Sequence, residues 1–289
     1  MEAVGKIYLN QPSRSTVWSL YNLSDIHLGN KACAKGRLLK DIKEIKSNKY
    51  ARWFATGDLG EYISHSDKRH DFGALDPEIF DTPDKLGNIG KTVHDVLMDL
   101  LSPIKDKCLG VGIGNHEWSY SVRENQESLQ RALSIALGVP YLGYTAFMDT
   151  VFCRLEHDKV SIRHLLTHGS GGSATPGGKI NRLVKYTYMF DADVYWVGHM
   201  HDDIHKIVPL IKADVKCKEV IHAYKVAVLS GSYFRTYVQG AISYGEQKGY
   251  APTFLGPSRV DIEPFHFYKD NEGKERTKPI ITVKTEVEM

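Results

Sequence analysis

The sequence is poor in cysteine, and its few cysteines follow no metal-binding or disulfide pattern. Among 289 residues there are 4 cysteines, and none of them forms a CxxC pair. This scarcity argues against a cysteine zinc site, an iron–sulfur cluster and the disulfide framework of a small secreted domain. We therefore expect a reducing, cytoplasmic setting.

Long hydrophobic runs and a strong charge bias are also missing. No apolar stretch approaches the roughly 18 residues that a membrane-spanning helix needs, and the opening MEAVGKIYLNQPSRSTVW does not follow the pattern of a secretory signal. A formal net charge of +2 is too small to indicate a nucleic-acid-binding surface by itself. With 42% hydrophobic and 25% charged residues, the composition is that of an ordinary folded domain, and we expect no association with membranes.

Short apolar, β-rich segments alternate with amphipathic segments along the chain. Strands are expected at 16–23, 51–56, 108–113, 149–156, 160–167, 192–198 and 224–231. Helical periodicity occurs at 36–49, 90–105 and 122–138. This alternation predicts a layered α/β fold, and we expect a single domain over residues 1–289.

Two segments interrupt this rhythm. Residues 64–88 are polar and turn-rich, and a loop of this length is typical of a functional insertion near an active site. Residues 259–287 read as a two-stranded hairpin that turns around 271–273. We expect this hairpin to be appended to the same domain.

Polar residues follow five of the expected strands and form the main functional signal. These residues are Asp25 and His27, then Asp58, then Asn115 with His116 and Glu117, then His168, and finally His199 with His201. If the strands share one sheet region and one orientation, the side chains meet at a single rim, where open α/β sheets place their sites. A set of oxygen and imidazole donors without thiolates suits Mn²⁺, Fe or Zn²⁺.

The number of donors favours two metal ions over one. Seven of these residues are metal donors: Asp25, His27, Asp58, Asn115, His168, His199 and His201. Seven donors are too many for one tetrahedral ion but suit two ions that share a carboxylate. Asp58 is the candidate for the shared ligand, because a charge that directly follows a buried strand needs a partner. Each motif alone has an ordinary alternative, a surface or hydrogen-bonded side chain, and the occurrence of all five at strand exits favours the metal centre.

The motif series resembles that of the calcineurin-like metallophosphoesterase superfamily. The matching stretches are DIH at 25–27, GD at 57–58, GNHE at 114–117, the histidine of THG at 168 and GHMH at 198–201. The resemblance implies a four-layer α/β/β/α sandwich with a dinuclear metal site, in which manganese is favoured and iron or zinc are alternatives. It also implies the division of ligands: Asp25, His27 and His201 on one ion, Asn115, His168 and His199 on the other, and Asp58 bridging the two.

The same resemblance implies two catalytic roles. His116 is expected to protonate the leaving oxygen, a task that suits the pKa of imidazole. Related phosphatases orient this histidine with an aspartate three residues after the bridging one, and here that position is Glu61. A solvated surface carboxylate is the alternative for Glu61.

Departures from the family narrow the substrate. The protein phosphatase branch carries arginines where this chain has Tyr62 and Ile113, which argues against a protein substrate. A phosphodiester, in a nucleotide or a nucleic acid, is favoured, with Arg69 on the 64–88 loop as a candidate phosphate contact. The alternatives are a phosphomonoesterase acting on a small metabolite and a non-catalytic binding scaffold.

A glycine-rich stretch follows His168, and two nucleotide-binding motifs are excluded by their spacing. GSGGSATPGGKI at 169–180 lacks the P-loop spacing, and GVGIGN at 110–115 lacks the dinucleotide spacing and a following helix cap. Lys179 is expected to open a helix after the glycine-rich stretch, where it is a candidate anion contact. A flexible connector is the alternative for this stretch, and nothing in the sequence indicates the oligomeric state.

Overall fold

The structure is a computed structural model, which describes residues 1–67, 70–124, 128–214, 219–240, 243–247, 249–269, 273 and 275–285. Of the residues in these ranges, 214, 219 and 244 are described by their backbone alone.

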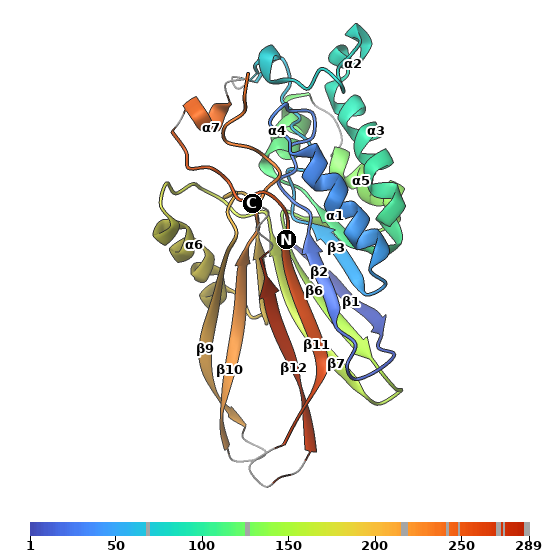
Figure 1. The fold of residues 1–289 in the computed structure, drawn as a ribbon, viewed down its shortest axis with the longest axis vertical. Helices are drawn as coiled ribbons and strands as arrows, with labels where there is room; N and C mark the ends of the chain where they lie inside the picture. Colours follow the sequence, from blue (N-terminus) through green and yellow to red (C-terminus); the bar gives the residue numbers. More distant parts are fainter. Residues whose placement is uncertain are drawn as a thin grey trace.

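Two six-stranded sheets form the centre of the molecule (Figure 1). The first sheet contains, in spatial order, β1 (Glu2–Asn10), β6 (Thr145–Cys153), β7 (Lys159–Thr167), β8 (Val194–Val197), β10 (Glu219–Leu229) and β9 (Ile204–Asp214). The second contains β12 (Glu275–Lys284), β11 (Ser258–Lys269), β2 (Trp18–Asn22), β3 (Ala51–Ala55), β4 (Cys108–Gly112) and β5 (Tyr141–Gly143). The central strands β2 and β8 are buried along their whole length, as expected for strands covered on both faces.

Helices cover the outer face of each sheet. The described helices are α1 (Lys35–Ser47), α2 (Pro83–Gly87), α3 (Ile89–Leu101), α4 (Asn115–Arg123), α5 (Leu129–Leu137), α6 (Pro176–Met189) and α7 (Tyr244–Gln247), with short 3₁₀ helices η1 (Phe72–Ala74) and η2 (Ser102–Lys107). Figure 1 shows α1, α3 and α5 on one side of the sheets and α6 on the other.

Three hydrophobic clusters hold these layers together. The middle cluster lies between the sheets and joins Met148 and Val228 of the first sheet to Phe54 of the second. A second cluster packs α1, α3 and α5 against β3 and β4, and a third packs Leu183 of α6 against β7, β8 and β10. The four-layer α/β/β/α sandwich predicted from the motif resemblance is therefore confirmed.

Three strands and one helix boundary were not predicted from the sequence. β1 buries only Leu9, β5 has three residues, and β9 is an edge strand with mostly exposed side chains, so none of them carries a clear apolar pattern. The helix expected at 122–138 is confirmed over Leu129–Leu137, which form α5, but its start is wrong, because residues 122 and 123 belong to the separate helix α4. The absence of a helix cap after GVGIGN is also wrong, since α4 begins at Asn115 with Gly114 as its N-cap residue.

The two segments that interrupt the sequence pattern lie in different places. Four residues of the expected insertion, His70, Asp71, Ala74 and Leu75, line the large cavity described below. At the other end of the chain, β11 and β12 pair antiparallel and extend the second sheet, while most of the turn expected at 271–273 lies outside the described residues. The assignment of the whole chain to one domain stays a prediction.

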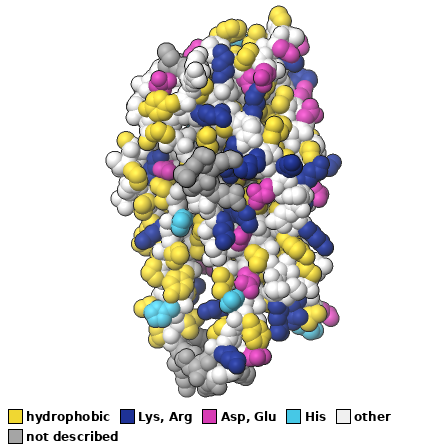
Figure 2. Space-filling view, viewed as in Figure 1, with side chains coloured by type: hydrophobic (Ala, Val, Ile, Leu, Met, Phe, Trp, Pro, Cys, Tyr) yellow, Lys and Arg dark blue, Asp and Glu magenta, His cyan; other side chains and the backbone are white. Residues whose placement is uncertain are grey.

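The surface shows mixed chemistry on the face seen in Figure 2. Lysine and arginine side chains are interspersed with aspartate and glutamate, and hydrophobic side chains gather towards the end where β9 and β10 lie. Ile207, Ile211 and Tyr224 of these two strands are more than half exposed. Among the described residues, no helix combines the length and the hydropathy that crossing a membrane would require.

Candidate metal centre

The five motifs meet at one edge of the sandwich, although they come from two sheets. Strands β2, β3 and β4 run parallel in the second sheet, and β7 and β8 run parallel in the first. The expectation of one shared sheet region is therefore wrong in detail. The motif residues still converge, because the carboxyl ends of both sets of strands open into the same cavity.

The first donor group consists of Asp25, His27 and His201, whose ligand atoms all lie within 4.8 Å of one another. His201 Nε2 lies 3.2 Å from Asp25 Oδ1 and 3.2 Å from His27 Nε2. Asp25 is fully buried and also accepts the main-chain N–H of His199 with both carboxylate oxygens, at 3.1 Å each. Three donors from the β2 and β8 exits are thus aimed at one point.

The second donor group consists of Asp58, His168 and His199, again within 4.8 Å of one another. His168 Nε2 lies 3.3 Å from Asp58 Oδ2 and 3.0 Å from Asn115 Oδ1, so the asparagine belongs to the same group. The main-chain N–H of His116 donates to Asp58 Oδ1 at 3.0 Å. The grouping follows the division that the resemblance implied, except that Asp58 falls with the second group alone. A third group, which overlaps the first, joins His27, Glu61 and His116. Both the bridge and metal ligation itself stay predictions.

The backbone is strained at these positions. Of the non-glycine residues described, six have positive φ angles, between 42° and 72°, and five of them are predicted ligands: Asp25, His27, Asp58, His199 and His201. The left-handed region costs about 1–3 kcal/mol per residue and persists where the surrounding structure enforces it, often at functional sites. The sequence offers no direct signal for this strain.

Two motif glycines are required by close packing. A Cβ on Gly57 would lie 2.3 Å from the main-chain nitrogen of Gly114, and a Cβ on Gly114 would lie 2.0 Å from Asp58 Oδ1. Neither position can hold a side chain without moving the loop that carries Asp58. The glycines of GD and GNHE therefore bring the β3 and β4 exits into direct contact.

The charges in the second group favour the protonated form of His168 and the ionised form of Asp58. Burial lowers the pKa of His168, but the carboxylates of Asp58 and Asp25 outweigh burial and raise it to about 9. Burial likewise raises the pKa of Asp58, and the imidazoles of His168 and His116 outweigh it and hold that pKa well below its usual range. A buried pocket that stabilises ionised carboxylates between imidazoles fits divalent cations with oxygen and nitrogen ligands.

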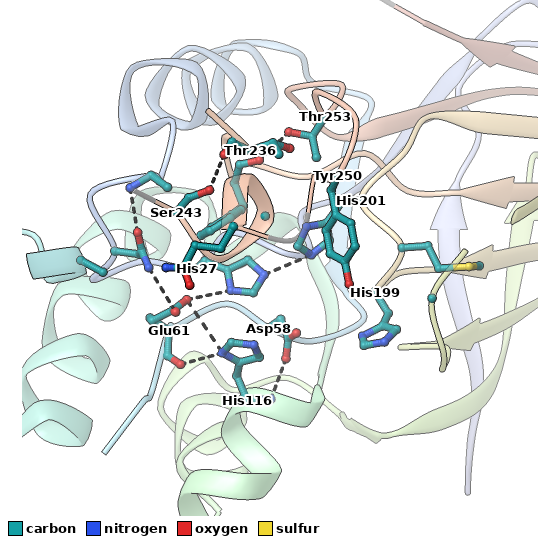
Figure 3. A pocket seen from close by; sticks show the side chains of 18 of the residues that line it. His27, Asp58, Glu61, His116, His199, His201, Thr236, Ser243, Tyr250 and Thr253 are labelled. Atoms are coloured by element: carbon teal, nitrogen blue, oxygen red, sulfur yellow. Dashed lines mark hydrogen bonds and ion pairs between the residues drawn. The ribbon is translucent and has the colours of Figure 1, made fainter. Parts of the chain in front are cut away.

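His116 and Glu61 lie side by side, but their contact differs from the expected one. His116 Nδ1 lies 2.8 Å from the main-chain carbonyl oxygen of Glu61 and 3.8 Å from its carboxylate (Figure 3). The Glu61 carboxylate instead contacts His27 Nδ1 at 2.9 Å and Asn30 at 3.1 Å. Because Glu61 is only 7% exposed, the alternative of a solvated surface carboxylate is wrong.

Both donor groups open into one cavity of about 890 Å³. Lys179 lines this cavity and pairs with Asp202 at 3.0 Å, and it lies in the first turn of α6, which begins at Pro176 instead of Lys179. Arg69 lies outside the described residues.

The sequence reasoning missed one wall of the cavity, which is formed by residues between Phe234 and Thr253. The Phe234 ring packs at 5.1 Å from that of His27, and Tyr250 extends into the cavity in Figure 3. No motif in this segment distinguishes it from an ordinary loop.

The structural role of Glu117 was also not predicted from the sequence. It is fully buried, and its carboxylate accepts the main-chain N–H groups of Asp58, Leu59 and Gly114 at 2.6–3.0 Å. Burial raises the pKa of Glu117 to about 7, with the charge of Asp58 adding to the effect. This carboxylate ties the loop after β3 to the start of α4, and its position as the last residue of GNHE was the available signal.

Comparisons with known proteins give structural neighbours and no sequence match. No protein-family model and no curated protein matches the chain. A predicted phosphoesterase from Streptococcus pneumoniae is similar at 12% identity and a TM-score of 0.34, over 93% of this chain and 99% of that one. A metallophosphoesterase from Sphaerobacter thermophilus is similar at 12% identity and a TM-score of 0.36, over 92% and 88%.

A third similar structure is GAP50, the anchor in the inner membrane complex of Plasmodium, at 10% identity and a TM-score of 0.42, over 93% and 90%. One of these three proteins is named as a metallophosphoesterase and one as a predicted phosphoesterase. Structural similarity at these TM-scores supports no functional inference, and the function proposed below depends on the geometry of the site.

Proposed function

We propose that this chain is a metal-dependent phosphoesterase that hydrolyses phosphodiesters. One observation carries the proposal: two clusters of carboxylate and imidazole donors, built from four loops, open into one cavity. Two divalent ions held there would lower the pKa of water and neutralise the charge that builds on the phosphoryl oxygens during in-line displacement.

His116 is the proposed general acid. Its Nδ1 faces a carbonyl oxygen, which can only accept a hydrogen bond, so Nδ1 carries the proton of the neutral ring. Nε2 is then the nitrogen that can gain a proton and give it to the leaving oxygen. The ring lies at the cavity wall, 4.7 Å from that of His27, so it is placed beside the donor groups.

The charges along the cavity support a diester over a monoester. A monoester carries a charge of about −1.5 to −2 near pH 7, whereas a diester carries a single negative charge. Among the described residues that line the cavity there is no arginine, and its two lysines are already bonded, Lys31 to the Gly73 carbonyl and Lys179 to Asp202. Asp202 offsets the charge of Lys179, whereas Lys31 donates to a neutral carbonyl and keeps its charge, so the described lysines of the lining add little more than one positive charge to the predicted metal ions.

A protein substrate receives no support from the positions that distinguish the protein phosphatase branch. Tyr62 and Ile113 are 1% and 2% exposed and lie in the interior. A cavity of about 890 Å³ is near the upper end of the range for small-molecule sites, which accommodates a nucleotide-sized group. On the face seen in Figure 2, the described lysine and arginine side chains are interspersed with acidic ones.

The test compares a diester with a monoester in the same metal-loaded protein. We expect a higher kcat/KM for bis(p-nitrophenyl) phosphate than for p-nitrophenyl phosphate, with single- and double-stranded DNA assayed in parallel and a chelator as the control. Preference for the monoester would contradict the diester assignment and favour a phosphomonoesterase. Activity that survives complete metal removal would contradict the proposal as a whole.

A further inference from the structure

Both carboxylate oxygens of Glu61 are committed to hydrogen bonds with the first donor group and its loop. Oε2 lies 2.9 Å from His27 Nδ1, and Oε1 accepts the side-chain N–H of Asn30 at 3.1 Å. The asparagine cannot reverse its amide, because its Oδ1 already accepts the main-chain N–H of Ala32 at 2.8 Å. Glu61 is therefore held in one orientation against His27.

This contact determines which nitrogen of His27 can act as a ligand. An ionised carboxylate only accepts hydrogen bonds, so Nδ1 of His27 carries the proton. The lone pair is then on Nε2, the atom that faces His201 Nε2 at 3.2 Å within the first donor group. A carboxylate behind a metal-binding histidine fixes the tautomer and the ring orientation and makes the ligand more basic.

The second donor group lacks this support at its buried histidine. His168 is fully buried, and its Nδ1 is without a hydrogen-bond partner among the described residues. Its ring packs edge-on against Tyr144, with centroids 5.4 Å apart, which restricts the ring without accepting a proton from Nδ1. The two groups therefore have similar donors and unequal support.

Glu61 holds His116 by a different part of the residue. The main-chain carbonyl of Glu61 faces His116 Nδ1 at 2.8 Å, and its main-chain N–H donates to the carbonyl of Leu28 at 2.9 Å. A change of the side chain leaves both main-chain groups in place. The effects of Glu61 on His27 and on His116 can thus be separated by mutation.

We propose that the Glu61 side chain is a positioning residue for His27. Because of this support, the Asp25–His27–His201 group is the tighter of the two metal sites, and the Asp58–His168–His199 group is the weaker. The inference rests on the proposed function only in taking both groups as metal sites. In this proposal the Glu61 carboxylate affects metal affinity, and the main-chain carbonyl of Glu61 orients His116.

The experiment titrates the metal-free full chain with Mn²⁺ by calorimetry and counts bound metal by electron paramagnetic resonance. The parent protein is expected to show a tight and a weak site. His201→Ala should remove the tight one and His199→Ala the weak one, which assigns each affinity to its group. Glu61→Gln should weaken the tight site by roughly 10- to 100-fold and leave the weak site unchanged, because a glutamine cannot accept from both His27 and Asn30.

Two further variants complete the test. Asn30→Ala should weaken the same site by a smaller factor, since it frees one oxygen of Glu61. Asp76→Asn is the matched control: Asp76 is a buried carboxylate on a nearby loop that pairs with Lys35 at 2.8 Å, and its change should leave both affinities as they are. Circular dichroism of each metal-free variant checks that the fold is retained.

The result that overturns the inference is a Glu61→Gln variant whose tight site is unchanged, or whose two sites weaken equally. A shift in the pH profile of kcat for this variant, with metal affinity unchanged, would instead show that the carboxylate acts on His116. Failure of the proposed function would look different, because two metals would bind with the expected affinities while no phosphate ester was hydrolysed.

Discussion

The two donor groups of the candidate metal centre have nearly the same composition and are built by different contacts. Each contains one buried aspartate and two histidines. In both, a main-chain N–H from another motif holds the aspartate: that of His199 for Asp25 and that of His116 for Asp58. The histidines differ, because His27 has a carboxylate behind it and His168 has none among the described residues.

The two groups share main-chain contacts. The main chain of His199 holds Asp25 of the first group, while its side chain belongs to the second group. The β3 and β4 exits are joined in the same way by Gly57, Gly114 and Glu117. The aspartates are thus held by main-chain contacts that cross between the groups, whereas the Glu61 carboxylate contacts a histidine of the first group alone.

Metal removal should have the largest effect on activity. It also tests whether the two donor groups bind two metal ions. Dialysis against a chelator should reduce hydrolysis of bis(p-nitrophenyl) phosphate to the background rate, and Mn²⁺ should restore it. Restoration is expected to require two equivalents of metal per chain, measured by elemental analysis. Full activity at one equivalent would show that only one of the groups is needed.

His116→Gln should have the next largest effect, and it should leave both groups intact. Loss of a general acid lowers kcat by roughly 10²- to 10⁴-fold. Because His116 contributes its main-chain N–H to Asp58 and glutamine retains that group, metal stoichiometry should stay at the parent value. Loss of a metal ion in this variant would show that the His116 ring is a ligand.

Asp58→Asn tests the predicted bridge between the groups. Removing one preorganised electrostatic contact in an active site lowers kcat by about 10²- to 10³-fold, and a shared ligand should in addition weaken both Mn²⁺ affinities together. Asp25→Asn is the matched comparison, since Asp25 has its ion-pair contact in the first group, with His201. An Asp58→Asn variant that weakens one affinity alone would contradict the bridge.

The alternation of apolar and amphipathic segments was sufficient to predict a layered α/β fold, because it depends on short-range signals, whereas the four-layer arrangement was implied by the resemblance of the motifs. β8 is a continuous apolar run, and β2 is buried along its whole length with Ser19 and Asn22 among its apolar residues, and motif residues follow shortly after each strand. β1 and β9 lie at the edges of their sheet, where exposed side chains obscure the period, so they carry no such signal.

The contacts of Glu61 could not be predicted for a different reason. Its partner depends on side-chain direction across the loop after β3, and a spacing in the sequence does not specify direction. Asn30, which lies 31 residues away, holds the carboxylate against His27, and Phe234 reaches the same site from beyond β10. Such contacts between distant segments arise only when the chain has folded.

The smallest expected effect is on stability, and it contrasts a histidine of the core, His164, with a histidine of the candidate site, His168. His164 lies on β7, four residues before His168, and both are fully buried. Both ring nitrogens of His164 are bonded, to Trp196 Nε1 at 3.2 Å and to Thr150 at 2.9 Å. Burial lowers the pKa of His164 to about 3, although the charge of Asp149 opposes the shift, so the ring is neutral in the folded protein.

Because this pKa is lower in the folded chain than the unfolded value of 6.5, His164 supports the fold above pH 6.5, and the support is lost as pH falls towards about 3. Across that window the free energy of unfolding should fall by about 1.4 kcal/mol per pH unit from this group alone. His164→Gln keeps a donor and an acceptor without the titration, so urea denaturation of the metal-free proteins between pH 6 and 4 should show a shallower decline in the variant. Equal slopes would mean that His164 takes up its proton over the same pH range in the folded and the unfolded chain, and the contrast between a structural histidine on β7 and the predicted ligand that follows the strand would then be lost.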